Sequence, residues 1–402
     1  MRLNKIRVTL WGNWPQLVLY AVLIAVFSSL LWFNLGSLTG GYSPQELQTT
    51  LASTGWRHIF EQPVNAPYLV AVRLLSYLFD NHLLITRVVS AVVGLATLAL
   101  FYILVRYWHG ERTALVGTLL FGFSAWFLHT ARLGVPDVLL FGILALVACY
   151  LWLRNTGSGL ALLGCFILAG ALLYVPGMVW FIALGALLQW KSVDRYFKKN
   201  LWAVTAGGLL LIIALVPLGM AIYNHPEVAK VYAGLPATGW PMPFEVLKNI
   251  ALVPVHIFWQ GQVQPEHWLS KLAVLDYFTT AMFFLGGYLY IRNVRLRRFW
   301  LMVAILSAGT VLVSLGGAVS LTILVPFLYI IAAAGIGFLI DNWITVFPRN
   351  VIAQSVGYGL VSLAVVATCT YSVRHYFVAW PQAQATKAVF TVKEQPRSDT
   401  IH

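Results

Sequence analysis

Residues 84–106 read LITRVVSAVVGLATLALFYILVR, an apolar run with arginine only near its start and at its end. A run of about 20 apolar residues has the length that a helix needs to cross roughly 30 Å of hydrocarbon. Soluble domains average about 25% charged residues, whereas this chain of 402 residues has 10% charged and 60% hydrophobic residues. The sequence therefore predicts an all-α polytopic membrane protein.

Similar apolar runs occur along most of the chain, separated by short polar breaks, and they predict about 11 transmembrane helices. The breaks at 131–136 and 174–177 are only a few residues long. The predicted spans are 14–36, 84–106, 112–130, 135–154, 158–174, 176–190, 201–223, 272–291, 299–314, 318–340 and 352–373.

Lys and Arg residues gather in alternate loops. Cytoplasmic loops carry an excess of Lys and Arg, and eleven spans with a cytoplasmic N-terminus place every basic cluster on that side. The net charge of +13 then reflects topology and attraction to anionic lipid, not binding of nucleic acid. We expect an integral protein of the cell membrane with its C-terminus outside. The basic clusters are Arg2/Lys5/Arg7, Arg106/Arg112, Arg154, Lys191/Arg195/Lys198/Lys199, Arg292/Arg295/Arg297/Arg298 and Arg349.

Two long loops fall on the outer side in this topology, at 37–83 and 224–271. Apolar residues at spacings of three to five between 47 and 60 predict a helix of about 16 residues that lies in the membrane interface. The apolar segment 67–79 suits a second interfacial helix. The loop 224–271 mixes aromatic and cationic residues, a composition that suits lipid headgroups or a sugar phosphate.

The chain divides into one large domain and a tail. We expect residues 1–373 to form a single transmembrane domain, with the functional site between the two external loops. Residues 374–402 are expected to form a polar external tail, disordered from Lys393 onwards. The three cysteines lie within apolar spans and have no metal-ligand spacing, so they predict no metal site.

Two acidic residues stand at the non-cytoplasmic ends of predicted spans, Glu46 and Asp137. In so apolar a chain, a carboxylate near the membrane either caps a helix or takes part in chemistry. Residues 43–46 read Ser-Pro-Gln-Glu, which fits a capping box. Asp137 follows Val-Pro and falls in the first turn of a helix, where the helix dipole favours an acid. Both interpretations stay open for each residue.

The order of several short motifs resembles a known class of enzymes. Together they resemble the GT-C membrane glycosyltransferases, in the branch of protein mannosyltransferases and aminoarabinose transferases, over about residues 14–350. The motifs are Arg87-Val-Val-Ser-Ala-Val-Val-Gly94, Leu104-Val-Arg-Tyr-Trp-His-Gly-Glu-Arg-Thr-Ala114, Ala131-Arg-Leu-Gly-Val-Pro-Asp137, Leu324-Val-Pro-Phe-Leu-Tyr329 to Ala334-Gly335, and Phe347-Pro-Arg-Asn350.

This resemblance implies transfer of a sugar from a polyprenyl phosphate to a glycan, lipid or protein acceptor outside the membrane, as in cell envelope glycosylation. A carboxylate of the first loop acts as base or orients the acceptor, and an acid at the start of the fourth span assists; these would be Glu46 and Asp137. A divalent metal assists in some relatives. Cationic groups hold the lipid phosphate, with the candidates Arg73, Arg87, Arg132, Lys230, Lys248 and His256.

The chain departs from the family pattern at one critical position. Relatives have Asp-Glu in the first loop, and here Gln45 stands in place of the Asp, although an amide cannot accept a proton at neutral pH. The basic residue that relatives place before Pro-Phe-Leu is also missing from 317–322. A catalytically silent relative that binds lipid-linked sugar or a membrane partner is therefore an alternative. A transporter or flippase is a further one, but the chain shows no inverted repeat.

The topology makes a direct prediction. A reporter fused after Asn200 should read cytoplasmic, because this position follows the cluster of Lys191 to Lys199. A reporter inserted near Ala237 should read external. The opposite result at either position would overturn the N-in, C-out orientation.

Overall fold

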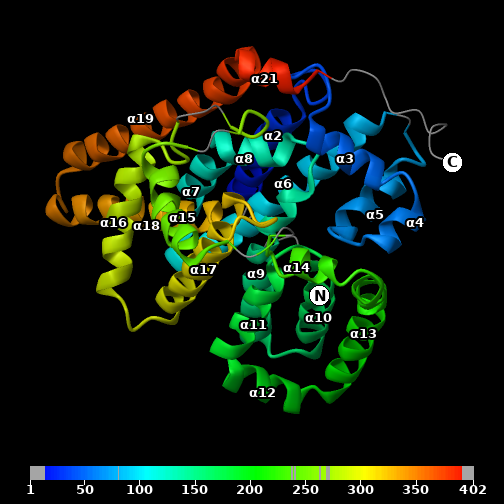
Figure 1. The fold of residues 1–402 in the computed structure, drawn as a ribbon. Helices are drawn as coiled ribbons and strands as arrows, with labels where there is room; N and C mark the ends of the chain where they lie inside the picture. The colour runs from blue at the N-terminus through cyan, green and yellow to red at the C-terminus, as the bar shows by residue number, and fades with distance from the viewer. Residues whose placement is uncertain are drawn as a thin grey trace.

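The computed structural model describes residues 14–391 except 80, 237–238, 240, 262–263 and 269–271. The N-terminal basic cluster and the tail from Lys393 lie outside these residues. The described chain consists of helices joined by loops (Figure 1), which confirms the all-α prediction.

The first half of the chain runs from α2 to α12. Its elements are α2 (Trp14–Trp32), α3 (Pro44–Ala52), α4 (Trp56–Glu61), α5 (Ala66–Leu75), α6 (His82–His109), α7 (Glu111–Phe123), α8 (Ala125–Arg132), the 3-10 helix η1 (Pro136–Phe141), α9 (Gly142–Thr156), α10 (Gly159–Leu172), α11 (Met178–Leu188) and α12 (Trp190–Lys199).

The second half runs from α13 to α21. Its elements are α13 (Leu201–Asn224), α14 (Glu227–Tyr232), α15 (Pro243–Phe258), α16 (Tyr277–Arg292), α17 (Arg297–Ser314), the 3-10 helix η2 (Leu321–Ile323), α18 (Val325–Val346), α19 (Val351–Arg374), the π-helical turn η3 (His375–Ala379), α20 (Trp380–Gln382) and α21 (Gln384–Val389).

Within the described residues, six helical segments are long and apolar enough to cross a membrane, and the bent pair α7 and α8 would make a seventh. Each of the predicted ranges contains a helix, but several of these, such as α10 and α11, are shorter. The chain is an integral membrane protein, and the total of about 11 spans stays a prediction. The long apolar segments are His82–His109, Pro136–Thr156, Leu201–Asn224, Arg297–Ser314, Leu321–Val346 and Val351–Gln382.

The predicted span 112–130 is broken in the structure. Helices α7 and α8 meet at an angle of 63°. Ser124 stands at the break, where its hydroxyl donates to the Phe121 carbonyl oxygen at 2.6 Å and accepts from the Phe127 amide at 3.3 Å. A serine hydroxyl that hydrogen-bonds both the last turn of one helix and the first turn of the next stabilises such a break. After the bend, α8 leads directly to the segment that begins η1.

The first long loop also differs from its prediction. Its apolar stripe forms two short helices, α3 and α4, instead of one helix of about 16 residues. Ser53 ends the first helix and Gly55 begins the second with an extended backbone. The second predicted segment is helical as α5. In Figure 1 these three helices form a cluster at one side of the bundle.

The described part of the predicted tail does not stand apart from the bundle. The helical path continues from α19 through η3 to α21. Tyr376 and Trp380 are buried, and the Trp380 indole donates to the carbonyl oxygen of Pro265 at 3.0 Å. Large aromatic side chains contribute strongly to packing, so Tyr376 and Trp380 attach this segment to the bundle beside the second long loop.

Helices α16 and α18 cross at a contact between two glycines. A Cβ on Gly286 would lie 1.8 Å from the carbonyl oxygen of Ile331, and one on Gly335 would lie 2.0 Å from that of Met282. Membrane helices lack a strong hydrophobic drive to associate and rely on close packing of small residues. This pair of glycines therefore fixes the separation of the two helices.

We expect Gly286→Ala to lower the thermal stability of the protein in detergent, because the new methyl group must push α18 away. Overpacking of this kind costs about 1–3 kcal/mol. Gly287→Ala is the matched control, since a Cβ there meets no atom within 4 Å. Equal melting temperatures for the two variants would contradict the proposed close contact.

Candidate active site

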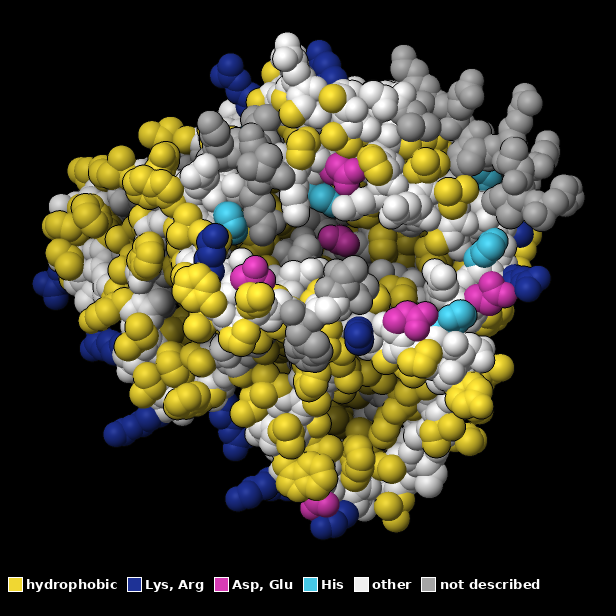
Figure 2. Space-filling view, viewed as in Figure 1, with side chains coloured by type: hydrophobic (Ala, Val, Ile, Leu, Met, Phe, Trp, Pro, Cys, Tyr) yellow, Lys and Arg dark blue, Asp and Glu magenta, His cyan; other side chains and the backbone are white. Residues whose placement is uncertain are grey.

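A hollow opens in the middle of one face of the molecule, with acidic and histidine side chains in and around it (Figure 2). It corresponds to a cavity of about 520 Å³ with a largely polar lining. Its walls come from α3, the turn before α5, α8 with η1, and the segments 264–267 and 316–322. A polar cavity with convergent titratable groups is the natural candidate for an active site.

Asp137 lines this cavity from the first turn of η1. Its side chain is half-buried, and within the described residues no group hydrogen-bonds to its carboxylate. The preceding Pro136 fixes the backbone at the start of η1 and directs the chain out of the bend after α8. Asp137 therefore offers a free carboxylate to a molecule in the cavity.

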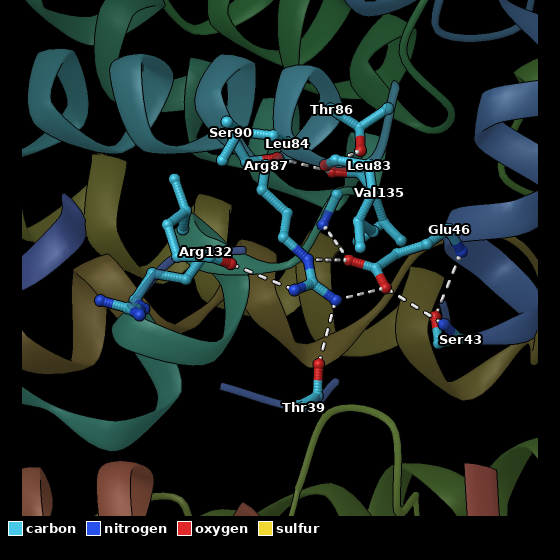
Figure 3. A network of polar contacts seen from close by, with 12 residues as sticks. Thr39, Ser43, Glu46, Leu83, Leu84, Thr86, Arg87, Ser90, Arg132 and Val135 are labelled. Carbon is cyan, nitrogen blue, oxygen red and sulfur yellow. Dashed lines mark hydrogen bonds and ion pairs between the residues drawn. The ribbon is translucent and has the colours of Figure 1, made fainter. Parts of the chain in front are cut away.

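Glu46 occupies a different environment. It is fully buried and forms the capping box with Ser43 that the sequence predicts. Its carboxylate accepts hydrogen bonds from the Ser43 amide at 3.1 Å, the Gly134 amide at 2.9 Å, and Arg87 at 2.8 and 2.9 Å. Figure 3 shows this carboxylate facing the guanidinium of Arg87. Both carboxylate oxygens are thus hydrogen-bonded within the protein, and Glu46 is not among the residues that line the cavity.

Arg87 and Arg132 were expected to bind phosphate, but both are buried and engaged within the protein. Besides Glu46, Arg87 donates to the Thr39 hydroxyl and the Gly41 carbonyl oxygen, each at 3.0 Å. Arg132 donates to the Tyr376 hydroxyl at 3.1 Å and lies over the ring of Phe377. Neither side chain lines the cavity.

The other predicted phosphate ligands also lie away from the cavity. Arg73 packs over the ring of Tyr77, and Lys230 and Lys248 are exposed. His256 contacts the carbonyl oxygen of Gln260 at 2.9 Å. Among the described residues that line the cavity, none is Lys or Arg. The structure therefore brings Asp137 and Gln45 together and places the candidate cations elsewhere.

Analysis of the sequence alone did not single out His267. Its Nε2 atom lies 2.7 Å from Oε1 of Gln45, and both side chains line the cavity. This contact joins the two long loops across 222 positions. The sequence Glu266-His267-Trp268 could have suggested an ordered position for His267, because a bulky aromatic residue next to polar groups can anchor a loop.

Asn65 is another residue that the sequence analysis missed. It lines the cavity with a left-handed backbone, at φ 57°, and its amide donates to the Tyr174 carbonyl oxygen at 2.9 Å. Such backbone conformations in residues other than glycine are uncommon and concentrate at functional sites. Nothing in the local sequence marks this conformation.

The wall behind the cavity is aromatic. His129 is buried between the rings of Trp268, Tyr376 and Trp380, with centroids at 5.5, 4.7 and 4.5 Å. Its Nε2 atom and the hydroxyl of Ser320 are buried without a hydrogen-bond partner among the described residues. Both residues contribute to the cavity lining, and buried polar atoms normally find a partner.

A divalent metal was considered as a cofactor from the resemblance. Within the described residues, no group of three or more His, Cys, Asp or Glu side chains is placed to hold a metal ion. A metal site built from protein side chains alone requires several such ligands, and the described residues do not provide one.

Comparison with known proteins adds the family context. Residues 61–220 match a family model described as dolichyl-phosphate-mannose-protein mannosyltransferase. The chain is similar to the crystal structure of ArnT from Cupriavidus metallidurans in the apo state, with 16% identity and a TM-score of 0.52, covering 93% of this chain and 77% of ArnT. The structure of ArnT bound to undecaprenyl phosphate matches with the same identity and TM-score, over 92% of this chain and 76% of ArnT. Comparison with curated proteins found no match.

These likenesses confirm the resemblance to GT-C membrane glycosyltransferases. The chain has the ArnT fold along nearly its whole length. The family match includes Asp137 but neither Gln45 nor His267.

The buried ion pair makes a prediction that separates structure from chemistry. Glu46→Gln leaves the Arg87 guanidinium buried without a counter-charge, and breaking a buried pair in this way costs about 3–5 kcal/mol. We expect a large fall in melting temperature in detergent. Glu61→Gln is the control, because its pair with Arg57 is exposed and contributes little. A Glu46→Gln protein of unchanged stability but without activity would instead assign Glu46 to catalysis.

Proposed function

We propose that this protein transfers a sugar from a polyprenyl-phosphate donor to an acceptor on the non-cytoplasmic side of the membrane. The observation that carries the proposal is the free carboxylate of Asp137 in a polar cavity of an ArnT-like fold. A lipid-linked donor requires a site at the edge of the bilayer. Asp137 meets this requirement, because η1 begins the long apolar segment Pro136–Thr156.

The reaction is a displacement at the anomeric carbon of the sugar. The acceptor oxygen forms a bond to this carbon while the bond from the carbon to the phosphate oxygen breaks. Positive charge develops on the sugar in the transition state, and a preorganised negative group stabilises it. We assign this role to Asp137.

A second cavity offers room for the polyprenyl chain. It has a volume of about 670 Å³ and a mainly apolar lining that includes Phe258, Tyr329 and Tyr371. Trp268 and His375 form part of its wall, and the same Trp268 ring packs on Trp126 and His129 of the first cavity. A donor with its prenyl chain in this apolar cavity would place its headgroup beside the aromatic wall.

A catalytically silent protein that binds lipid-linked sugar is the second candidate. Two observations favour it. Gln45 is an amide and supplies no acid to the cavity, and none of the described residues that line the cavity is a Lys or Arg that could bind the phosphate. The polar lining of the cavity would still accommodate a polar headgroup. The two candidates differ in turnover, not in binding.

Asp137→Asn tests the catalytic proposal. The substitution keeps the shape of the side chain and removes its charge, and no described hydrogen bond to the carboxylate is lost. We expect unchanged thermal stability and a fall in turnover of about 10²-fold or more, the usual scale for removing one group that stabilises charge in the transition state. Turnover is measured in liposomes as undecaprenyl phosphate released from a set of undecaprenyl-phosphate sugars, in the presence of extracted membrane glycolipids.

The control is Asp194→Asn on α12, an exposed acid paired with Lys198 far from the cavity in sequence. It should retain full activity. Wild-type protein that binds these donors but releases no undecaprenyl phosphate would establish the silent candidate. Full activity of Asp137→Asn would remove Asp137 from the mechanism.

A further inference from the structure

We propose that His267 is the general base of the transfer reaction and that Gln45 is the positioning residue that orients it. This inference rests on the proposed function and deepens it. The sequence resemblance implies that Gln45 stands where relatives have the acid of the first loop, and the structure brings an imidazole from the second loop to that residue. The contact between Nε2 of His267 and Oε1 of Gln45 measures 2.7 Å.

The hydrogen bond determines which imidazole nitrogen is free. An amide oxygen can only accept a hydrogen bond, so Nε2 of His267 carries the proton and donates to Gln45. In a neutral imidazole the other nitrogen, Nδ1, then holds a lone pair. Gln45 thus fixes the tautomer in which Nδ1 is the basic nitrogen. An orienting partner of this kind is a common feature of catalytic histidines.

The turn that carries His267 is held from both sides. The His267 and Trp268 amides both donate to the Gln264 carbonyl oxygen, at 3.0 and 2.7 Å. The buried Trp268 ring packs on Trp126 at 4.9 Å, and the Trp380 indole donates to the Pro265 carbonyl oxygen. A catalytic group needs support that keeps its rotamer in place. This anchored turn supplies it.

Gln45 is held equally well at the start of α3. The capping box of Ser43 and Glu46 fixes the first turn, and the Thr49 hydroxyl donates to the Gln45 carbonyl oxygen at 2.8 Å. Residues at i, i+3 and i+4 share one face of a helix. Gln45, Gln48 and Thr49 therefore face the cavity together, while Glu46 points to Arg87.

The proposed step balances in protons and electrons. As the acceptor oxygen bonds to the anomeric carbon, its proton passes to Nδ1 of His267. The bonding electron pair between the carbon and the phosphate oxygen leaves with the polyprenyl phosphate. The imidazolium that forms then releases its proton to water. No oxidant, reductant or further reactant is required.

The charges around His267 favour this step. Among the described residues, Glu266 precedes it in the turn, Glu46 lies behind on α3, and Asp137 lines the same cavity from η1. His129 on α8 is a further titratable group on the cavity wall. Partial burial raises the pKa of the Glu266 carboxyl, while the neighbouring His267 opposes that rise. Nearby carboxylates stabilise an imidazolium. Since the base must begin neutral, activity should rise with pH as the imidazole loses its proton.

His267→Gln is the central test, because Gln can keep a hydrogen bond to Gln45 but cannot act as a base. With the undecaprenyl phosphate release assay, we expect kcat to fall by about 10²-fold or more, with little change in KM for the donor or in melting temperature. The acidic limb of the kcat–pH profile should disappear. The matched control is His58→Gln, an exposed histidine on α4 outside the cavity, which should behave as wild type.

Two further variants separate a base from a structural contact. His267→Ala should recover part of its activity when free imidazole is added, because a base in solution can occupy the vacated space. Gln45→Glu places a carboxylate against Nε2, which raises the pKa of an imidazole, so the acidic limb should move to higher pH. A limb that moves to lower pH would show that the new carboxylate is itself the base.

The outcomes distinguish this inference from the proposed function. If wild-type protein is active and Asp137→Asn is not, but His267→Gln keeps full activity and its acidic limb, the proposed function stands and His267 is not the base. Loss of activity in His267→Ala without rescue by imidazole, together with a lowered melting temperature, would make His267 structural. Wild-type protein without turnover overturns both proposals.

Discussion

The buried ion pair between Glu46 and Arg87 is the constraint on which the rest of the site depends. It ties the first long loop to α6 with two hydrogen bonds between charged groups, at 2.8 and 2.9 Å. The Gly134 amide also donates a hydrogen bond to the Glu46 carboxylate. Gly134 itself lies very close to α6, because a Cβ on it would lie 2.3 Å from the Thr86 hydroxyl oxygen. A buried charge without its partners is costly, so α3, α6 and the segment before η1 must come together at this point.

This constraint decides which neighbouring residue reaches the cavity. Successive residues of a helix point about 100° apart, so a Glu46 directed at Arg87 turns Gln45 outward. The same contact holds Gly134 in place, three residues before Asp137, and thereby sets where η1 begins. Arg87 and Arg132, two of the predicted phosphate ligands, are engaged in contacts within the protein. Asp137, Gln45 and His267 are among the residues that line the cavity.

The sequence predicted those features that depend on local pattern. The long apolar runs required helices, Ser43 and Glu46 formed their capping box, and Asp137 was identified as an acid at the start of a helix. It did not predict that Arg87 pairs with Glu46 or that His267 reaches Gln45, contacts that span 41 and 222 positions. Such pairings depend on how helices pack in three dimensions and leave no periodic signal in the chain. The break at Ser124 was missed for a related reason, because an apolar stretch reads the same whether or not a single serine interrupts it.

The combination of Gln45 with His267 is also consistent with the local charge balance. An acid at position 45 would stand next to Glu46 in α3 and in a region that already holds Glu266 and Asp137. Like charges close together resist ionisation, so another carboxylate would compete with Asp137 for its charged state. A neutral amide avoids this repulsion and still accepts a hydrogen bond from the imidazole. In the proposed mechanism the basic group is then a histidine whose charge appears only during the reaction, where the surrounding carboxylates stabilise it.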